Sequence, residues 1–271
     1  METHRFITAA VQLCAGSDKQ LNLDKAESFT AEAARHDARL VVLPEVFLWR
    51  GPRTEEHNGA EPIPGAATDH LGKLARSLGL YLLAGSILEL SGGDKVFNTS
   101  VLFNPHGEII ARYRKMHLFD IDLPGHITIR ESDTRAAGDA VVTVPTELGV
   151  IGMSVCYDLR FPELYRRLTW AGAQIVAIPS AFTFPTGAAH WEILVRARAI
   201  ENQVYVIAPD QIGRSPSGVV DFGNSMIVDP WGKPLARAAD REMIIFAEID
   251  REYQQKVRRE LPCLEHAGFG K

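Results

Sequence analysis

The chain has 271 residues, of which 46% are hydrophobic and 23% charged, and its formal net charge is −5. This length supports one large α/β domain or two small ones. The acidic balance offers no basic face, which excludes nucleic acid as an expected partner. The three cysteines, Cys14, Cys156 and Cys263, are spread along the chain and do not form a disulfide framework. The first residues lack the apolar core of a signal peptide, and no apolar run reaches membrane-spanning length. We therefore expect a cytoplasmic protein with reduced thiols and no membrane partner.

The first half of the chain alternates between strand and helix patterns. Strands are expected at 6–13, 40–43, 81–90, 97–103 and 108–113, and helices at 22–36 and 69–78. The run at 40–43 is uniformly apolar, which is typical of a strand buried on both faces, and Pro44 ends it just before Glu45. A loop rich in proline and glycine covers 51–65. A long polar segment at 115–139 has no periodicity, and long loops of this kind are often functional.

The second half shows the same alternation. Strands are expected at 150–155, 174–178, 205–208 and 243–249, helices at 162–170, 188–202 and 252–260, and a hairpin turn at 229–232.

Two stretches of the first half align without gaps with two stretches of the second half, in the same order. Residues 97–112 align with 222–237, and residues 38–47 align with 173–182. Similar turn chemistry explains the hairpin match alone, but two matches in the same order favour duplication. We expect an α/β fold in which two mixed sheets face each other with helices outside, a four-layer αββα sandwich with internal pseudo-two-fold symmetry. The candidate site residues come from both halves, so residues 1–271 are expected to form a single domain.

Cys156 ends an apolar strand pattern, and Pro162, which suits the first turn of a helix, follows shortly after it. A strand feeding a sharp turn would place the thiol at the carboxyl end of the strand. Backbone N–H groups point outward there, and the helix dipole favours a thiolate. A lone cysteine is more often a buried structural residue, and we apply that interpretation to Cys14 and Cys263, which have no polar setting. Cys156 is the candidate nucleophile.

Three charged residues stand at strand ends or in the long polar segment. Glu45 follows the buried run, Lys115 ends the strand at 108–113, and Glu131 lies within 115–139. Each has an ordinary alternative, because a loop acid or a strand-end lysine is usually solvated. A thiol nucleophile, however, needs a base to take its proton and donors to hold the oxyanion that it creates. Together with Cys156, these residues can supply that set.

Three segments resemble the signatures of the nitrilase, or carbon–nitrogen hydrolase, superfamily. They are Leu43-Pro44-Glu45, the segment 113–119 and the segment 156–163. The resemblance continues, in order, through 179–182, 190–192, 198–202 and 228–232, and so covers nearly the whole chain. It implies a pseudo-symmetric αββα sandwich that pairs through helices into homodimers or larger assemblies.

Carried over by position, the resemblance implies Glu45 as general base, Cys156 as nucleophile and Lys115 as oxyanion stabiliser, with the backbone N–H of Tyr157 as a second donor. Glu131 matches a second acid that positions substrate and water in the amidase branches. The reaction implied is hydrolysis of a small-molecule amide through a thioester, with water as the second substrate. No metal or organic cofactor is implied.

The sequence leaves two other classes of function open. A cysteine–histidine hydrolase would use His117 or His190 as its base, although His117 could instead orient the Lys115 loop and His190 opens a helix that is expected to pack. A superfamily member kept as a scaffold or binding module would be expected to have lost a candidate catalytic residue, whereas this chain retains them all.

The segment 115–132 is similar to the omega-amidases, which act on 2-oxoglutaramate and 2-oxosuccinamate. The segment 186–201 is at least as close to the deaminated glutathione amidases. Both groups therefore imply a 2-oxo acid amide that carries a carboxylate. A nitrilase, an N-carbamoyl amino acid hydrolase or an aliphatic amidase of the same superfamily is the alternative.

A carboxylate is gripped well by an arginine, which can donate two parallel hydrogen bonds. The chain departs from the omega-amidases after Glu45, where Val-Phe-Leu-Trp-Arg-Gly-Pro-Arg replaces an Asn-Ser-Pro-Tyr-like segment. Arg50 and Arg53 in this stretch are the candidate carboxylate contacts, and Phe182 and His190 are further candidate substrate contacts.

Overall fold

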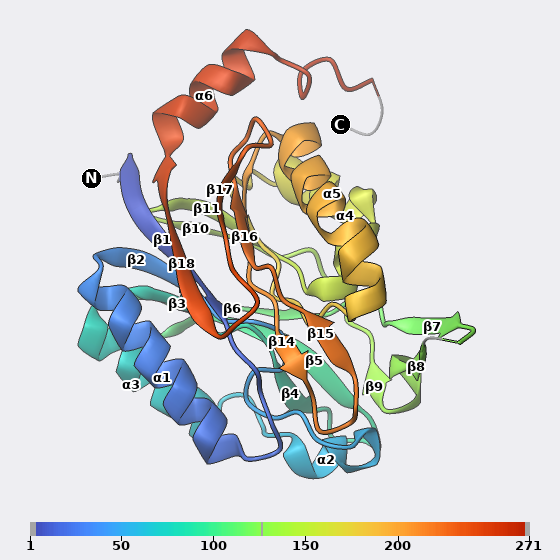
Figure 1. The fold of residues 1–271 in the computed structure, drawn as a ribbon. Coiled ribbons are helices and arrows are strands. Elements are labelled where there is room, and N and C mark those ends of the chain that lie inside the picture. The colour runs from blue at the N-terminus through green and yellow to red at the C-terminus, as the bar shows by residue number, and fades with distance from the viewer. Residues whose placement is uncertain (1–3, 126, 269–271) are drawn as a thin grey trace.

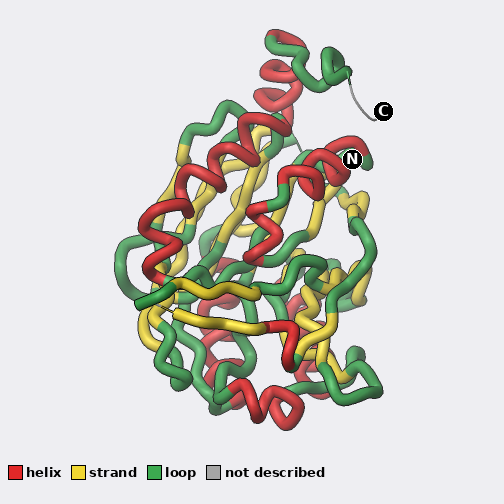
Figure 2. Tube along the Cα trace, turned by 90° about the vertical axis from the view of Figure 1, so that its right-hand side faces the viewer, coloured by secondary structure: helices red, strands yellow, loops and turns green. Residues whose placement is uncertain are grey.

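The computed structural model describes residues 4–125 and 127–268, in which two mixed β-sheets face each other between two layers of helices (Figure 1). The helices are α1 (Lys19–Arg35), α2 (Glu56–Gly59), α3 (Ala66–Leu78), α4 (Pro162–Trp170), α5 (Phe184–Asn202) and α6 (Arg251–Glu260). Short 3₁₀ turns are η1 (Arg53–Glu55), η2 (Glu131–Asp133) and η3 (Cys156–Arg160). Helices α1 and α3 cover the first sheet, and α4 and α5 cover the second. Helix α6 projects beyond the sandwich near the C-terminus (Figure 2).

The two sheets share a common pattern of strands, in keeping with the expected internal repeat, and the first sheet has two strands more than the second. The first contains β18 (Met243–Asp250), β1 (Arg5–Gln12), β2 (Ala38–Val42), β3 (Tyr81–Leu83), β5 (Val96–Phe103) and β4 (Ile87–Leu90), with β6 (Ile109–Arg114) and β9 (Arg135–Ala136) also paired to β5. The second contains β10 (Thr143–Thr146), β11 (Gly149–Met153), β12 (Ile175–Ala177), β13 (Tyr205–Ala208), β16 (Met226–Val228) and β17 (Pro234–Arg237). In each sheet an antiparallel edge strand is followed by three parallel strands and then by an antiparallel hairpin. Two small ribbons, β7 (Asp120–Leu123) with β8 (Ile127–Arg130) and β14 (Ile212–Arg214) with β15 (Val220–Phe222), lie outside the sheets.

Residues 40–42 of strand β2 are apolar because both of its faces are buried there. Its side chains alternate between the two faces of the first sheet. Leu40 and Val42 belong to the core between the sheets, together with Ile175 of the second sheet. Val41 belongs to the other core, together with Leu71 of α3. A strand buried on both faces cannot carry polar side chains at either register, so the first polar residue after it marks the edge of the sheet.

The expected strand at 81–90 is wrong, because it divides into β3 and β4. Gly85 interrupts it with a φ of +39°, and a Cβ there would lie 1.9 Å from the carbonyl oxygen of Pro44. Only glycine allows this close approach of two chain segments. The bend brings Glu45, the first polar residue after β2, close to the neighbouring strand. There Glu45 can contact side chains of β5.

The expectation of a segment without regular structure at 115–139 is also wrong in part. It contains the β7–β8 ribbon, the turn η2 and the short strand β9. Period-two alternation over four residues is too short to stand out in a sequence. Three helices, α1, α3 and α5, begin three or four residues earlier than expected. Pro185 near the start of α5 is compatible with its first turn.

Candidate active site

The strand-end residues from both halves meet at one cavity. Glu45, Lys115, Glu131 and Cys156 all line it. The backbone N–H of Glu45 donates to the carbonyl oxygen of Ser180 over 3.3 Å. These two residues occupy equivalent positions in the two aligned repeats, so the cavity lies where the repeats meet.

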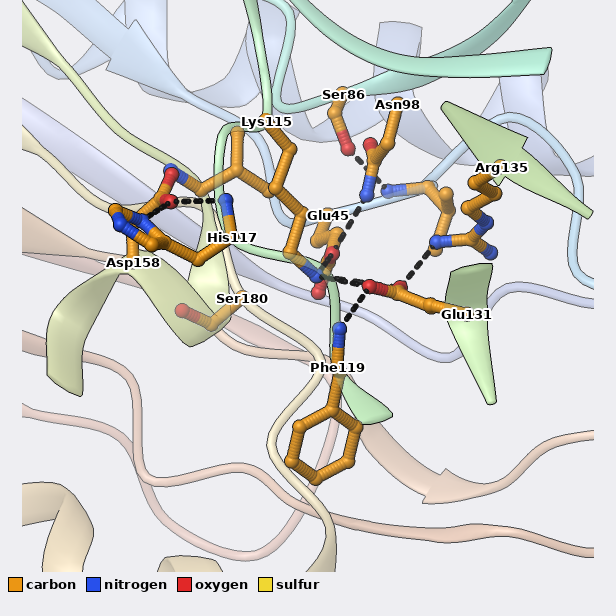
Figure 3. Close-up of polar contacts among 12 residues, drawn as sticks. Glu45, Ser86, Asn98, Lys115, His117, Phe119, Glu131, Arg135, Asp158 and Ser180 are labelled. Atoms are coloured by element: carbon orange, nitrogen blue, oxygen red, sulfur yellow. Dashed lines mark hydrogen bonds and ion pairs between the residues drawn. The ribbon is translucent and has the colours of Figure 1, made fainter. Parts of the chain in front are cut away.

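Glu45 is buried, and one of its carboxylate oxygens accepts two hydrogen bonds. Oε1 accepts a hydrogen bond from Asn98 Nδ2 at 2.7 Å and one from Lys115 Nζ at 2.9 Å (Figure 3). Because both donors address Oε1, Oε2 is the oxygen that is better placed to exchange a proton. Sequence reasoning missed Asn98, although it lies within the aligned repeat, because an uncharged residue inside a strand gives no separate functional signal.

Lys115 lies between two carboxylates and is 1% exposed. Its Nζ donates to Glu45 Oε1 at 2.9 Å and to both oxygens of Glu131 at 3.2 and 2.9 Å. Burial by itself would lower the pKa of this ammonium, but Glu131 and Glu45 outweigh burial and leave the pKa raised. The lysine is therefore a fixed cation at the base of the cavity.

Glu131 is also buried, and it is held from three sides. Besides Lys115, the backbone N–H of Phe119 donates to its Oε2 at 2.7 Å, and Arg135 Nη1 contacts its Oε1 at 2.5 Å (Figure 3). Burial would raise the pKa of this carboxyl, but the charges of Lys115 and Arg135 lower it to about 2. Glu131 is consequently an acceptor and not a proton donor at neutral pH.

Cys156 follows β11 at the first position of η3, with a φ of +51°. Its backbone N–H donates to the carbonyl oxygen of Pro179 at 2.9 Å, which ties the turn to the second sheet. Burial, and next the charge of Glu45, raise the pKa of the thiol well above its usual range, against the opposing effect of Lys115. Burial thus outweighs the dipole of the turn, which by itself would favour a thiolate. A neutral thiol needs a base at the moment of attack.

Asp158 links the Cys156 turn to the Lys115 strand. Its Oδ2 accepts from the backbone N–H of Val155 at 2.8 Å and from Tyr113 Oη at 2.7 Å, and its Oδ1 lies 2.7 Å from His117 Nδ1 (Figure 3). The His117 ring also stacks on Phe161, with the two ring centres 3.6 Å apart. His117 thus contacts Asp158, in keeping with the orienting role that sequence reasoning weighed against a role as base.

The remaining candidate contacts lie at different distances from the thiol. Phe182 lines a small hollow beside Cys156, together with Tyr157. His190 is exposed on α5, and its Nδ1 lies 3.2 Å from Nη1 of Arg160. His190 is absent from the lining of both hollows around Cys156.

Arg50 and Arg53 both line the cavity, but their surroundings differ. Arg50 forms a two-pronged ion pair with the buried carboxylate of Asp221, through Nη1 and, at 3.2 Å, through Nη2. Asp221 belongs to none of the motifs described above and lies 171 residues from Arg50 along the chain. The sequence alone therefore does not reveal this pair. Nη1 of Arg53 is buried and has no hydrogen-bond partner among the residues that the structure describes. Burial, reinforced by the charge of Arg135, lowers the pKa of the Arg53 guanidinium.

Within residues 4–125 and 127–268, no group of three or more His, Cys, Asp or Glu side chains is arranged to hold a metal ion. In the same part of the chain, no helix combines the length and apolarity needed to cross a bilayer.

The fold is shared with solved structures of the nitrilase superfamily, which indicates the class of protein. Nit3 of Saccharomyces cerevisiae, described as a member of branch 10 of the nitrilase superfamily, superposes with a TM-score of 0.89 at 35% identity and covers 99% of this chain and 98% of its own. A mutant amidase from Nesterenkonia sp. superposes with a TM-score of 0.81 at 27% identity over 96% of this chain and 97% of its own, and it carries the acetamide moiety of fluoroacetamide on its active-site cysteine.

The family follows from the sequence. The family model for carbon–nitrogen hydrolases matches residues 7–259, and the chain belongs to this family. The omega-amidase NIT2 of Mus musculus is 41% identical over 260 residues, which are 96% of this chain and 94% of that protein. The protein is therefore a hydrolase of the nitrilase superfamily that is similar to omega-amidases.

Proposed function

We propose that the protein hydrolyses a small-molecule amide that carries a carboxylate, through a thioester on Cys156. The substrates that fit best are 2-oxo acid amides such as 2-oxoglutaramate or deaminated glutathione. The neutral Cys156 thiol lies in one cavity with Glu45 and Lys115, which supports a base-assisted attack. The similarity to omega-amidases supports the choice of an amide over a nitrile or a carbamoyl group.

The first half-reaction transfers the acyl group to the enzyme. Glu45 takes the proton of Cys156 as Sγ attacks the amide carbon, and the carbonyl oxygen gains negative charge opposite Lys115 Nζ and the N–H of Tyr157. When the C–N bond breaks, Glu45 returns the proton to the leaving nitrogen, so that ammonia departs from a primary amide. The thioester remains on Cys156.

The second half-reaction uses the same groups with water. Glu45 takes a proton from a water molecule as its oxygen attacks the thioester carbon, and Lys115 again faces the oxyanion. Sγ then leaves and is reprotonated by Glu45, which releases the free acid. Glu131, fixed by Lys115 and Arg135, is proposed to orient the substrate and this water.

The single observation that carries the substrate class is the unpartnered Nη1 of Arg53 in the wall of the cavity. Arg50 and Arg135, the other arginines of the lining, are each bonded to carboxylates of the protein. A buried guanidinium N–H without an acceptor is costly, and a substrate carboxylate would supply the acceptor. We infer that Arg53, and not Arg50, binds the carboxylate of the substrate.

Replacement of Arg53 by glutamine is expected to raise KM for 2-oxoglutaramate and to change kcat little, because the guanidinium does not touch the reacting bond. Loss of one charge-assisted contact corresponds to roughly 10- to 100-fold in KM. The measurement is the initial rate of ammonia release, with the methyl ester of the same amide as a matched neutral substrate. An Arg53→Gln variant that treats acid and ester as the wild type does would place the carboxylate contact elsewhere.

We also propose that the chain forms homodimers or larger homo-oligomers through the outer face of α4 and α5. Ile193 and Ile200 of α5 are 69% and 48% exposed, and Trp170 of α4 is 40% exposed. The β16–β17 turn extends this apolar surface, because Gly232 packs against the side chain of Ile200. Large apolar side chains exposed on two neighbouring helices are typical of a protein interface.

Light scattering is expected to give a multiple of the monomer mass for the wild type and a lower mass for Ile193→Asp at equal concentration. Leu21→Asp on α1 is the matched control, because Leu21 is also exposed but lies on the opposite layer. A monomeric wild type, or an Ile193→Asp variant of unchanged mass, would contradict this interface.

A further inference from the structure

A row of alternating charges connects the wall of the cavity with the base Glu45. It runs through Glu56, Arg135, Glu131, Lys115 and Glu45, and Figure 3 shows the part from Arg135 to Glu45. All five side chains are buried. The last three already have proposed roles in the reaction, whereas Arg135 and Glu56 have none.

Arg135 divides its guanidinium between two carboxylates. Nε and Nη2 bind the two oxygens of Glu56 at 3.1 and 2.6 Å, and Nη1 binds Glu131 at 2.5 Å. Its backbone is held in β9, where it pairs with Val96 of the first sheet. Glu56 lies three residues after Arg53, on the segment proposed to bind the substrate carboxylate. Arg135 thus connects that segment with the catalytic end of the cavity.

The donor count at Lys115 explains why a second cation is needed. An ammonium has three N–H donors, and three oxygens already surround Nζ within 3.2 Å, one from Glu45 and two from Glu131. An oxyanion that forms at Cys156 can gain a donor from Lys115 only if a contact to one carboxylate loosens. A buried carboxylate that loses its cation is strongly destabilised, so Glu131 needs another partner at that moment.

We propose that Arg135 is a positioning residue that holds Glu131 during the reaction and so allows Lys115 to direct an N–H to the oxyanion. The proposal rests on the function proposed for Cys156. Arg135 acts through Glu131 and Lys115 and does not touch the reacting atoms.

The proposal has a pH signature. The charged groups that act on Glu131 are Lys115 and Arg135, with Arg53 nearby, and the Phe119 N–H adds a hydrogen bond. Removal of Arg135 removes one of the two main effects that lower the pKa of Glu131, so this pKa rises. A carboxyl that takes up a proton at a higher pH loses its role earlier on acidification, and the acid limb of kcat moves to higher pH.

The test measures kcat and KM against pH for Arg135→Gln with 2-oxoglutaramate. We expect kcat to fall roughly 10- to 100-fold at neutral pH, KM to change little, and the acid limb to lie at higher pH than in the wild type. Arg135→Lys keeps the charge and should keep the acid limb close to that of the wild type. A folded Arg135→Gln variant with unchanged kcat and an unchanged pH profile would overturn the proposal.

Two further variants keep the test decisive. Arg237→Gln is the matched control, because it removes a guanidinium that pairs with Glu192 and does not line the cavity, so its pH profile should match the wild type. Should Arg135→Gln fail to fold, the double variant with Glu56→Gln removes the unpaired Glu56 carboxylate, and Arg135→Lys supplies a folded comparison whose acid limb must stay in place.

Cys156→Ala distinguishes failure of the proposed function from failure of the role proposed for Arg135. If it retains turnover, the proposed function fails, whereas an inactive Cys156→Ala beside a wild-type-like Arg135→Gln refutes only the role of Arg135.

Discussion

Cys156→Ala is expected to lose amide hydrolysis by roughly 10⁴-fold or more, because the thioester route requires the thiol and no other group can take its place. The burial of Cys156 beside Glu45 and Lys115 is the basis for this expectation. The measurement is ammonia release from 2-oxoglutaramate and from deaminated glutathione, with unfolding curves to show that the variant is folded.

The other two free cysteines supply matched controls. Cys14 is half-buried, and Cys263 is exposed near the C-terminus. Neither lines the cavity, so Cys14→Ala and Cys263→Ala should keep wild-type turnover. Measurable turnover in Cys156→Ala above the background of enzyme-free buffer would assign the nucleophile to another group.

Lys115→Met is expected to reduce kcat by roughly 10²- to 10³-fold or more, the range for loss of an oxyanion donor. It should also destabilise the protein by about 3 to 5 kcal/mol at neutral pH, because Glu45 and Glu131 would remain buried without their shared cation. In this variant the folded-state pKa of Glu131 rises. Where that pKa exceeds the unfolded value, the lost stability returns as the pH falls and the carboxyl takes up a proton.

The measurements for Lys115→Met are initial rates and urea unfolding at neutral and mildly acidic pH. Lys25→Met is the matched control, since Lys25 pairs with Glu242 at the partly exposed surface and should affect neither quantity much. Normal kinetics in Lys115→Met would remove Lys115 from the oxyanion role. A variant as stable as the wild type would contradict the shared-cation arrangement.

The parts of the fold that could be predicted depend on local pattern. The uniformly apolar run before Pro44 predicts a strand buried on both faces, and β2 is such a strand. The two aligned stretches predict a duplicated arrangement, and both sheets contain an antiparallel edge strand, three parallel strands and an antiparallel hairpin. The β7–β8 ribbon escaped prediction because its short strands lie outside both sheets and carry mixed polar and apolar side chains.

The candidate site likewise contains residues that could be predicted from the sequence and residues that could not. Glu45 and Cys156 follow apolar strands, so their places at the sheet edge could be inferred from the residues before them. Arg135 and Asn98 could not be found, because their importance lies in contacts that form only when distant segments meet. The protonation state of Cys156 also depends on burial, which is a property of the folded chain. The sequence indicates a turn dipole that favours a thiolate and a base beside the thiol, but it does not give the extent of burial.

A thioester on Cys156 can be trapped in the Glu45→Gln variant. The variant would be mixed with the mono-p-nitrophenyl ester of glutaric acid and quenched with acid for peptide mass mapping. At mildly alkaline pH, hydroxide can take the thiol proton that Glu45 would otherwise remove, and nitrophenolate leaves without being protonated, so slow acylation can proceed. Hydrolysis of the thioester, in contrast, lacks the base that activates water. We expect nitrophenolate to be released in stoichiometric amount relative to the enzyme, and a glutaryl group to be found on the peptide that contains Cys156. Acylation of another residue, release without a covalent adduct, or no release above that of Cys156→Ala would contradict this expectation.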